Sequence, residues 1–286
     1  MDLTVRELLS EGVQRLQQAS AAAGGSATPD LDAEVLLAHV LSVPRTRLRS
    51  HPAEPAAEGA ASYRRLIERR ALGEPLAYLT GTREFWSLPL RVTPAVLVPR
   101  PETEFLVERA LALRSEPHGH AADLGTGSGA VALALASERP HWRVTATDLS
   151  REALAVARAN AAQLAIASVD FRQGSWFAPL AGERFDLIVS NPPYVAADDP
   201  ALDDPALAYE PRLALTPGAD ALACLRAIAH DAPQHLNRGG WLLLEHGAAQ
   251  GAALRHELVL AGFRYVRSHP DLAGHERITE GRYDPL

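Results

Sequence analysis

The sequence predicts an α/β protein whose main part is a mostly parallel sheet, preceded by a smaller helical region. From about residue 120 onward, short apolar runs typical of strands alternate with helix-like stretches, the order expected of βαβ units. Before about residue 75, apolar residues recur instead at the spacing of α-helices. A chain of 286 residues is long enough for one large domain and one small one.

The first 75 residues predict a helical domain. Thr4 and Glu7 have the spacing of a capping box, and the apolar residues that follow recur at helical period. A second helix is expected to begin near Asp30, and a third to cover residues 57–72 before Gly73 stops it. No residue here carries obvious chemistry, so we interpret residues 1–75 as a substrate-recognition domain.

Several arginines make this helical region locally basic. We favour a solvated helix surface over a docking patch for a partner, although both interpretations stay open. The residues concerned are Arg45, Arg47, Arg49, Arg64, Arg65, Arg69 and Arg70.

Residues 76–100 predict a β-hairpin linker. The pattern changes there to alternation, with turn residues at Gly81, Pro89 and Pro94. The stretch Pro99-Arg100-Pro101-Glu102 then stiffens the entry to residues 101–286, which we interpret as the catalytic domain.

Seven strands and four helices are predicted in the catalytic domain. The strands are expected at 120–124, 142–147, 168–172, 185–190, 240–245, 263–268 and 276–282. The helices are expected near 129–138, 150–163, 218–235 and 248–261. The acidic, proline-rich segment 195–217 is expected to be a lid, a substrate-contact loop or a passive surface loop.

A glycine-rich turn follows the first of these strands. Asp123-Leu124-Gly125-Thr126-Gly127-Ser128-Gly129 leads into a helix, so its backbone can approach a ligand closely. Asp148, about 20 residues on, ends a second strand, where an acid can bind ribose hydroxyls. Gly125, Gly127 and Ala130 also fit a nicotinamide fingerprint, so this pair of features alone leaves the cofactor open.

The stretch Ser190-Asn191-Pro192-Pro193-Tyr194 ends a buried-looking strand abruptly, in a turn that we expect to be stiff and exposed. The Asn191 amide oxygen and the Pro192 carbonyl are two acceptors that suit the two N–H bonds of a primary amide or exocyclic amine. Tyr194 offers a flat face for stacking. Taken alone, the turn is equally consistent with a simple loop.

Together these motifs resemble class I S-adenosylmethionine-dependent methyltransferases that act on a planar nitrogen. Further stretches resemble the HemK/PrmC family, the N5-glutamine methyltransferases of peptide-chain release factors. They are Pro75–Gly81, Glu84–Trp86, Leu97–Glu104, Leu243–Gly247 and Glu276-Arg277. The resemblance implies a Rossmann-like sheet of seven strands, with a last strand antiparallel to the others.

The resemblance also implies site residues and a reaction. A methyl group would pass from S-adenosyl-L-methionine to the glutamine of the Gly-Gly-Gln motif in class I release factors, modulating translation termination. Trp176 would lie against the adenine, while Ser175 stands where many relatives have an acid and is not counted as a ligand. The implied cofactor-binding residues are Gly125, Thr126, Gly127, Ser128, Gly129, Asp148, Trp176 and Asn191. Asn191, Pro192 and Tyr194 are the implied catalytic residues, and Pro193 joins these three in binding substrate.

Three alternatives stay open. A DNA adenine-N6 methyltransferase would share Asn-Pro-Pro-Tyr, but it usually needs a base-flipping surface. A ribosomal-protein glutamine methyltransferase would share the turn, but from the resemblance we expect it to have Pro-Arg-Ser-Pro at the linker. A cofactor-binding scaffold that recruits a partner through its helices is the non-enzymatic alternative.

Composition and charge limit the partners and the cellular location that we expect. The net charge of −7 disfavours broad binding to a nucleic-acid backbone, so no direct nucleic-acid partner is expected. We see neither a membrane span nor a signal peptide, and expect a cytoplasmic monomer. Cys224 is expected to be a buried structural thiol. We expect His118 and His120 to lie in a loop and not to bind metal.

Overall fold

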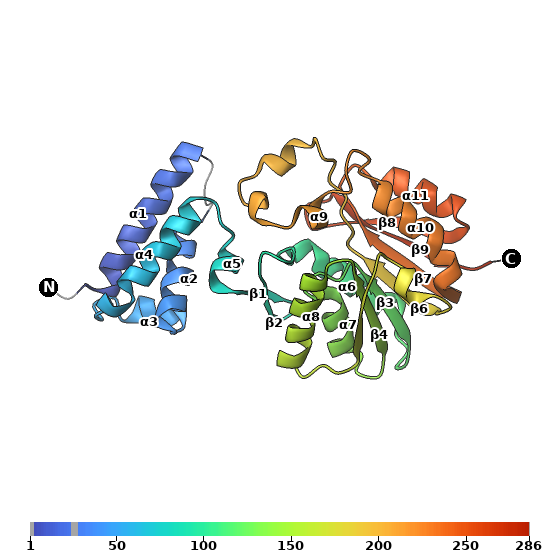
Figure 1. Cartoon of the computed structure of the whole chain (residues 1–286), viewed down its shortest axis with the longest axis horizontal. Helices are drawn as coiled ribbons and strands as arrows, with labels where there is room; N and C mark the ends of the chain where they lie inside the picture. The colour runs from blue at the N-terminus through green and yellow to red at the C-terminus, as the bar shows by residue number, and fades with distance from the viewer. Residues whose placement is uncertain (1–2, 24–27, 286) are drawn as a thin grey trace. The chain divides into compact units, whose positions relative to one another are not determined.

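The computed structural model describes residues 3–23 and 28–285. These residues divide into two compact units. Figure 1 shows the chain coloured by residue number, from blue at the N-terminus to red at the C-terminus. One unit holds the described residues up to Thr82 together with Asp203–Tyr209, and the other holds Arg83–Leu202 and the chain from Glu210 onward. No helix within the described part of the chain is long and apolar enough to cross a membrane.

The first unit is built from helices. They are α1 (Val5–Ala23), α2 (Pro29–Leu41), α3 (Arg45–Ser50), α4 (Ala57–Ala71) and α5 (Leu76–Thr80). The predicted capping box is present, because the Thr4 N–H donates to Glu7 Oε2 at 2.8 Å and the Glu7 N–H donates to Thr4 Oγ1 at 3.3 Å. The helices α3 and α5 were not predicted, since each is too short to show a helical period.

Acidic side chains in this unit pair with most of the arginines that make its sequence basic. Both Arg45 and Arg49 donate to Glu34, while Arg70 pairs with the buried Asp32. The further pairs are Arg15–Glu68, Arg47–Glu54, Arg64–Glu11 and Arg69–Glu74. The local excess of positive charge that the sequence indicates is therefore largely neutralised at short range.

A two-stranded hairpin opens the second unit. Strands β1 (Thr82–Phe85) and β2 (Leu88–Arg91) are joined by Trp86 and Ser87, whose φ angles are both positive, at 52° and 60°. Two central residues with positive φ match the type I′ turn, whose twist suits paired strands. A hairpin is present within the predicted range 76–100, but Leu76–Thr80 form the helix α5 instead of a strand, and the turn expected at Pro89 was wrong. Pro89 lies inside β2, where a two-stranded sheet tolerates proline because each strand is an edge.

The second unit is dominated by a seven-stranded sheet with the order β5-β4-β3-β6-β7-β9-β8. Strand β9 runs antiparallel to both of its neighbours, and the other pairs are parallel, as the family resemblance led us to expect. The strands are β3 (His120–Leu124), β4 (Arg143–Asp148), β5 (Val169–Gln173), β6 (Phe185–Ser190), β7 (Leu236–Glu245), β8 (Phe263–Pro270) and β9 (Glu276–Tyr283).

Helices cover both faces of this sheet (Figure 1). Alternate strand residues point to opposite faces, so Leu187 and Val189 join one apolar cluster while Ile188 joins the other. Helices α6 (Pro101–Leu113), α7 (Ala130–Glu138) and α8 (Arg151–Gln163) contribute to the first cluster. Helices α10 (Ala223–His235) and α11 (Gly251–Leu260) contribute to the second.

Short helical turns complete the second half of the chain. They are η1 (Ala178–Leu180), η2 (Pro200–Asp203), η3 (Leu207–Tyr209) and α9 (Arg212–Leu215). Helix α10 begins at Ala223, later than the predicted residue 218, because the chain before it is occupied by turns.

Candidate active site

The two principal motifs meet at the point where the strand order reverses. Strand β3 has β4 on one side and β6 on the other, so the connections that follow β3 and β6 start from adjacent strand ends. Leu124 pairs with Ser190, and the buried Ser190 hydroxyl donates to the Leu124 carbonyl at 2.6 Å. Open α/β sheets bind ligands in the crevice at such a switch point.

A cavity of about 390 Å³ lies there. Its volume is in the range of small-molecule sites. Of the residues predicted to form a site, the cavity wall includes Gly125, Gly127, Asp148, Trp176, Asn191 and Pro193. Ser175 is also in the wall. The structure therefore brings together residues from the ends of three adjacent strands and from the loop after a fourth.

Three residues of the glycine-rich turn lie behind the wall. Thr126 is buried, and its hydroxyl donates to Asp123 at 2.6 Å. Ser128 is also buried, and its carbonyl accepts from the Asn160 side chain at 2.9 Å. Gly129, with φ +85°, precedes α7 and packs close to side chains of the neighbouring helices. Their contacts support the shape of the turn.

Gly125 and Gly127 form the part of the turn that faces the cavity. Both have positive φ, at +74° and +55°. A Cβ on Gly125 would lie 3.2 Å from the Trp176 ring, which leaves little room for any larger residue. The Gly127 N–H donates to Asp148 Oδ2 at 2.8 Å, so the turn and the end of β4 are tied together.

Two acids of the site have raised pKa values. Burial raises the pKa of Asp148, and backbone N–H groups of Gly127 and Ser150 act in the opposite sense. Each Asp148 oxygen accepts one such bond and keeps a second lone pair for a hydroxyl group. Burial raises the pKa of Asp123 to about 6, although hydrogen bonds from Thr126 and Ala132 lower it.

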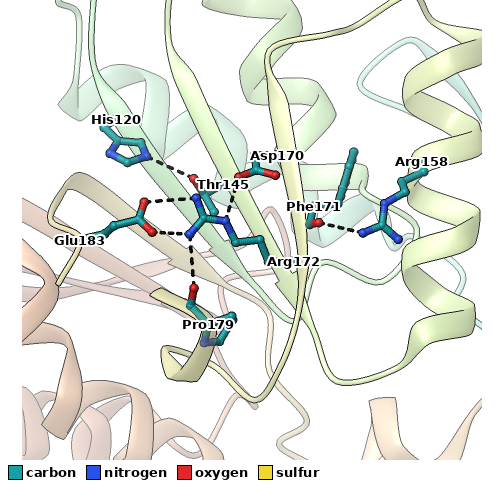
Figure 2. Close-up of polar contacts among 8 residues, drawn as sticks. All are labelled: His120, Thr145, Arg158, Asp170, Phe171, Arg172, Pro179 and Glu183. Atoms are coloured by element: carbon teal, nitrogen blue, oxygen red, sulfur yellow. Dashed lines mark hydrogen bonds and ion pairs between the residues drawn. The ribbon is translucent and has the colours of Figure 1, made fainter. Parts of the chain in front are cut away.

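Trp176 is held by the loop that follows β5. Its φ is +44°, an unusual conformation for a non-glycine residue, and its carbonyl accepts from the Thr147 hydroxyl at 3.1 Å. Figure 2 shows Arg172 at the base of this loop, where it donates to the Pro179 carbonyl at 3.3 Å and pairs with Glu183. These contacts hold the loop in the conformation that carries Trp176.

The turn at Asn191 is less exposed than the sequence led us to expect. Pro192 is buried, and Asn191, Pro193 and Tyr194 are half-buried, because neighbouring segments cover the strand end. Asn191 and Pro193 face the cavity. Tyr194 packs against the second apolar cluster, and its hydroxyl lies 3.3 Å from Glu245 Oε1. Burial raises the pKa of this hydroxyl, and the charge of Glu245 raises it further.

Sequence reasoning did not assign Thr103 and Glu245 to the site. Asn191 Nδ2 donates to the Thr103 hydroxyl at 3.1 Å, across 88 positions of sequence. Thr103 lies in the first turn of α6, and the buried Glu245 ends β7. The available signal was that both residues lie in stretches that resemble the family, Leu97–Glu104 and Leu243–Gly247, but this did not single out either side chain.

Part of segment 195–217 also forms the wall. The cavity is lined by Pro211, Leu213, Ala214, Thr216 and Pro217, so this portion is not a passive surface loop. The buried Glu210 anchors it by accepting from Arg100 and from the Val98 N–H at 3.0 Å.

Cys224 lies in the same wall. It is half-buried, not buried as expected, because it faces the cavity at the start of α10. Burial raises the pKa of its thiol, so the thiolate is disfavoured.

The chemistry of this wall fits a nucleoside cofactor. Asp148 supplies acceptors for ribose hydroxyls, and Trp176 and Leu149 supply apolar surface for a base. Gly125 and Gly127 leave backbone accessible where a side chain would fill space.

The sheet, with its single antiparallel strand, and the cavity at its switch point fit a class I S-adenosylmethionine-dependent methyltransferase. Residues 101–203 match the Methyltransferase small domain family, and residues 7–81 match the PrmC N-terminal domain family. A methyltransferase from Pyrococcus furiosus has a similar fold, with a TM-score of 0.52 and 20% identity over 69% of this chain and 90% of that chain.

Relatives that match nearly the whole chain identify the family to which it belongs. The release factor glutamine methyltransferase of Vibrio cholerae is 48% identical over 99% of this chain and 98% of its own length. The protein of the same name from Escherichia coli is 45% identical over 96% of this chain and 97% of its own length. The chain belongs to the release factor glutamine methyltransferase family, and S-adenosyl-L-methionine is its cofactor.

Proposed function

We propose that this protein transfers a methyl group from S-adenosyl-L-methionine to the side-chain amide nitrogen, N5, of the glutamine in the Gly-Gly-Gln motif of class I peptide-chain release factors. Such a modification would modulate translation termination. The observation that carries the proposal is the orientation of Asn191 in the cavity wall. Its amide nitrogen donates to Thr103, which leaves its carbonyl oxygen available to accept from a substrate N–H.

The proposed cofactor site extends from the glycine-rich turn to the loop after β5. Gly125–Gly129 hold the methionine part, Thr126 and Ser128 acting through their support of the turn, while Asp148 binds the ribose and Trp176 the adenine. Asn191 lies at the end of this site nearest the transferred group. When bound, the cofactor supplies a methyl group on a positively charged sulfur.

Asn191 and Pro192 are proposed to grip the substrate amide. Their two carbonyl oxygens accept from its two N–H bonds, which turns the nitrogen lone pair out of conjugation with the substrate carbonyl. Pro193 and Tyr194 keep the turn stiff, since proline fixes φ and the Tyr194 hydroxyl lies against Glu245. Orientation of this kind contributes several kcal/mol, on the order of what proximity supplies in other enzymes. The alkylated amide then loses a proton to water.

Recognition of the protein substrate is assigned to the helical part of the chain. In this proposal residues 1–75 bind the release factor, residues 76–100 connect the parts and residues 101–286 perform the transfer. The paired arginines of the helices support a protein partner over nucleic acid, because little uncompensated positive charge remains there. The protein is proposed to act as a cytoplasmic monomer.

The test is mass spectrometry of a release factor incubated with the protein and S-adenosyl-L-methionine. We expect a gain of one methyl group on the glutamine of the Gly-Gly-Gln peptide. The Asn191→Ala variant should lose about 100-fold or more in turnover, because one of the two acceptors is gone. Its affinity for the cofactor, measured by calorimetry, should stay within about threefold of the wild type.

Two results would overturn parts of the proposal. Near-normal turnover by Asn191→Ala would remove the assigned role of that residue. Labelling of a ribosomal protein or of DNA adenine, with no gain on the release factor, would leave the fold and cofactor in place but replace the substrate.

A further inference from the structure

The turn that carries Asn191 is held at its far end by two other segments of the chain. Its residues Pro192-Pro193 have no N–H, so they cannot anchor the turn by donating backbone hydrogen bonds. The peptide bond between Tyr194 and Val195 is held at both of its polar groups. The Val195 N–H donates to the Leu215 carbonyl at 3.1 Å. On the other side, the Tyr194 carbonyl accepts from Gln250 Nε2 at 2.9 Å.

Gln250 bridges this peptide bond to the loop that follows β7. It is half-buried and immediately precedes α11. Its Oε1 accepts from the Gly247 N–H at 2.8 Å, while its Nε2 donates to the Tyr194 carbonyl. A backbone N–H only donates and a backbone carbonyl only accepts, so these two partners allow a single orientation of the Gln250 carboxamide.

Gly247, the residue on which this bridge rests, is itself held by the sheet. Its carbonyl accepts from the Gln250 N–H at 2.9 Å and lies 2.9 Å from His246 Nδ1. Because a carbonyl only accepts, Nδ1 carries a proton, and Nε2 of the neutral ring accepts from the Thr279 hydroxyl of β9 at 2.8 Å. His246 is fully buried, and this burial lowers its pKa, which favours the neutral ring.

The held peptide bond lies close in sequence to the two acceptors that the proposed function assigns to the substrate amide. Proline fixes φ at residues 192 and 193, so few rotations are available to absorb a shift of Tyr194 before it reaches the Pro192 carbonyl. A displacement of about 1 Å at a reacting group can lower a rate by about 100-fold. Gln250 is not part of the cavity wall that the described residues form, so its loss should leave the cofactor site intact.

We propose that Gln250 is a positioning residue, which holds the Asn-Pro-Pro-Tyr turn in place by donating from the loop after β7 to the Tyr194 carbonyl. This inference rests on the proposed function, since it explains what keeps the Pro192 carbonyl directed at a glutamine amide. Gln250 acts through the turn and touches neither the substrate nor the cofactor.

Two variants separate the two halves of the bridge. Gln250→Glu keeps an oxygen that accepts from Gly247 but loses the donor to Tyr194. Gln250→Met keeps the length of the side chain and loses both hydrogen bonds. Gln163→Glu is the matched control, because Gln163 Nε2 at the end of α8 also donates to a backbone carbonyl, that of Pro89, at 3.0 Å.

The first measurement needs no substrate and follows the exchange of backbone amides with solvent in the ¹⁵N-labelled full-length protein. The Val195 N–H should exchange about fivefold faster or more in both Gln250 variants, on the order of the loss of one hydrogen bond. The Gly247 N–H should stay protected in Gln250→Glu and exchange faster in Gln250→Met. Gln163→Glu should leave the exchange of both amides unchanged.

The second measurement is turnover with a release factor. Both Gln250 variants should lower kcat about 10- to 100-fold, with cofactor affinity within about twofold of the wild type. Gln163→Glu should keep the wild-type kcat. If Gln250→Glu does not fold, Gln250→Met still decides the question.

The two measurements separate the possible failures. Val195 exchange and turnover that match the wild type in both Gln250 variants overturn the positioning role. Faster exchange with unchanged kcat also overturns it, and so does an equal loss of cofactor affinity and kcat. Faster Val195 exchange in both variants of a protein that methylates no release factor supports the positioning of the turn and overturns only the substrate.

Discussion

At the scale of single residues, the cavity depends on positions where a side chain would be in the way. Gly125 combines a φ of +74° with a Cβ position only 3.2 Å from the Trp176 ring. Any residue other than glycine loses conformational free energy in a left-handed conformation, and at this position its side chain would also displace the ring that forms one wall of the cavity. Gly125 therefore links the shape of the backbone to cofactor binding.

Gly125→Ala is expected to weaken cofactor binding about 10-fold or more, a loss of roughly 1.4 kcal/mol, because the new methyl group pushes against Trp176. It should also lower the free energy of unfolding by about 1–2 kcal/mol through the left-handed φ. Calorimetric titration with S-adenosyl-L-methionine and denaturant unfolding measure the two effects.

The matched control for this change is Gly182→Ala. Gly182 also has a positive φ, +78°, but a Cβ there would lie in open space as far as the described residues extend. The control should lose similar stability with unchanged cofactor affinity. Equal cofactor affinity in the two variants would contradict the importance of the contact with Trp176.

At the scale of secondary-structure elements, one buried acid joins α6, β8 and β9. The Glu280 side chain is fully buried and pairs with Arg109 of α6, with Arg267 of β8, and with His269 at 3.0 Å. Burial acts to raise the pKa of Glu280, but the hydrogen bonds from these side chains outweigh it, and the pKa is lowered from its ordinary value of 4.5. Ion pairs therefore stabilise the antiparallel edge of the sheet in addition to the hydrogen bonds between its strands.

Glu280→Gln is expected to lower the free energy of unfolding at neutral pH by about 3 kcal/mol, since it removes the buried charge that pairs with the largely covered Arg109 and with the more exposed Arg267. A group whose folded-state pKa is depressed stabilises the protein above its unfolded pKa, and the stabilisation is lost as pH falls through the folded pKa. The difference between variant and wild type should therefore shrink in acid. Denaturant unfolding at several pH values measures it.

Glu257→Gln serves as the comparison, because Glu257 pairs with Arg226 on the surface, where an ion pair is worth about 0–1 kcal/mol. If Glu280→Gln lowers the free energy of unfolding by no more than Glu257→Gln does, the buried cluster stabilises the protein no more than a surface ion pair. A difference from wild type that persists undiminished in acid would contradict the role of the carboxylate charge.

At the scale of the whole molecule, the distribution of charge decides which partners suit the protein. The net charge is −7, and most arginines of the helical unit are paired with acids within that unit. Long-range attraction to a polyanion needs uncompensated positive charge. This distribution of charge supports the proposal that the partner is a protein and not an extended nucleic-acid surface.

We expect the KM for a release factor to change by less than about threefold between 50 and 200 mM salt, whereas a protein that contacts 6–10 phosphates loses about 10³–10⁵ in affinity over that interval. Steady-state kinetics at both salt concentrations measure the change. Glu34→Gln removes the partner shared by Arg45 and Arg49, so it should raise retention on phosphocellulose relative to the wild type. A steep salt dependence of this KM would contradict the expectation, because it would show that uncompensated charge on this protein contributes to binding the release factor.

Much of the fold was predictable because its signals are local. The predicted strand 185–190 coincides with β6, and the predicted strand 120–124 coincides with β3. Apolar runs, glycine turns and prolines act on neighbouring residues, so they mark where an element begins and ends. The turn of the hairpin was not predicted because no local signal marks it. Trp86 and Ser87 adopt positive φ only because the paired strands impose it.

Local sequence patterns were enough to predict the α/β class, the mostly parallel sheet, and the glycine and Asn-Pro-Pro-Tyr turns at strand ends, whereas the antiparallel last strand was implied by the resemblance to a known family. The contact of Asn191 with Thr103, the contact of Tyr194 with Glu245 and the pairing of the helical arginines became visible in the folded structure alone. The first set depends on the conformational preferences of a few consecutive residues. The second depends on contacts between distant segments, which exist only once the helices have packed on the sheet and on each other.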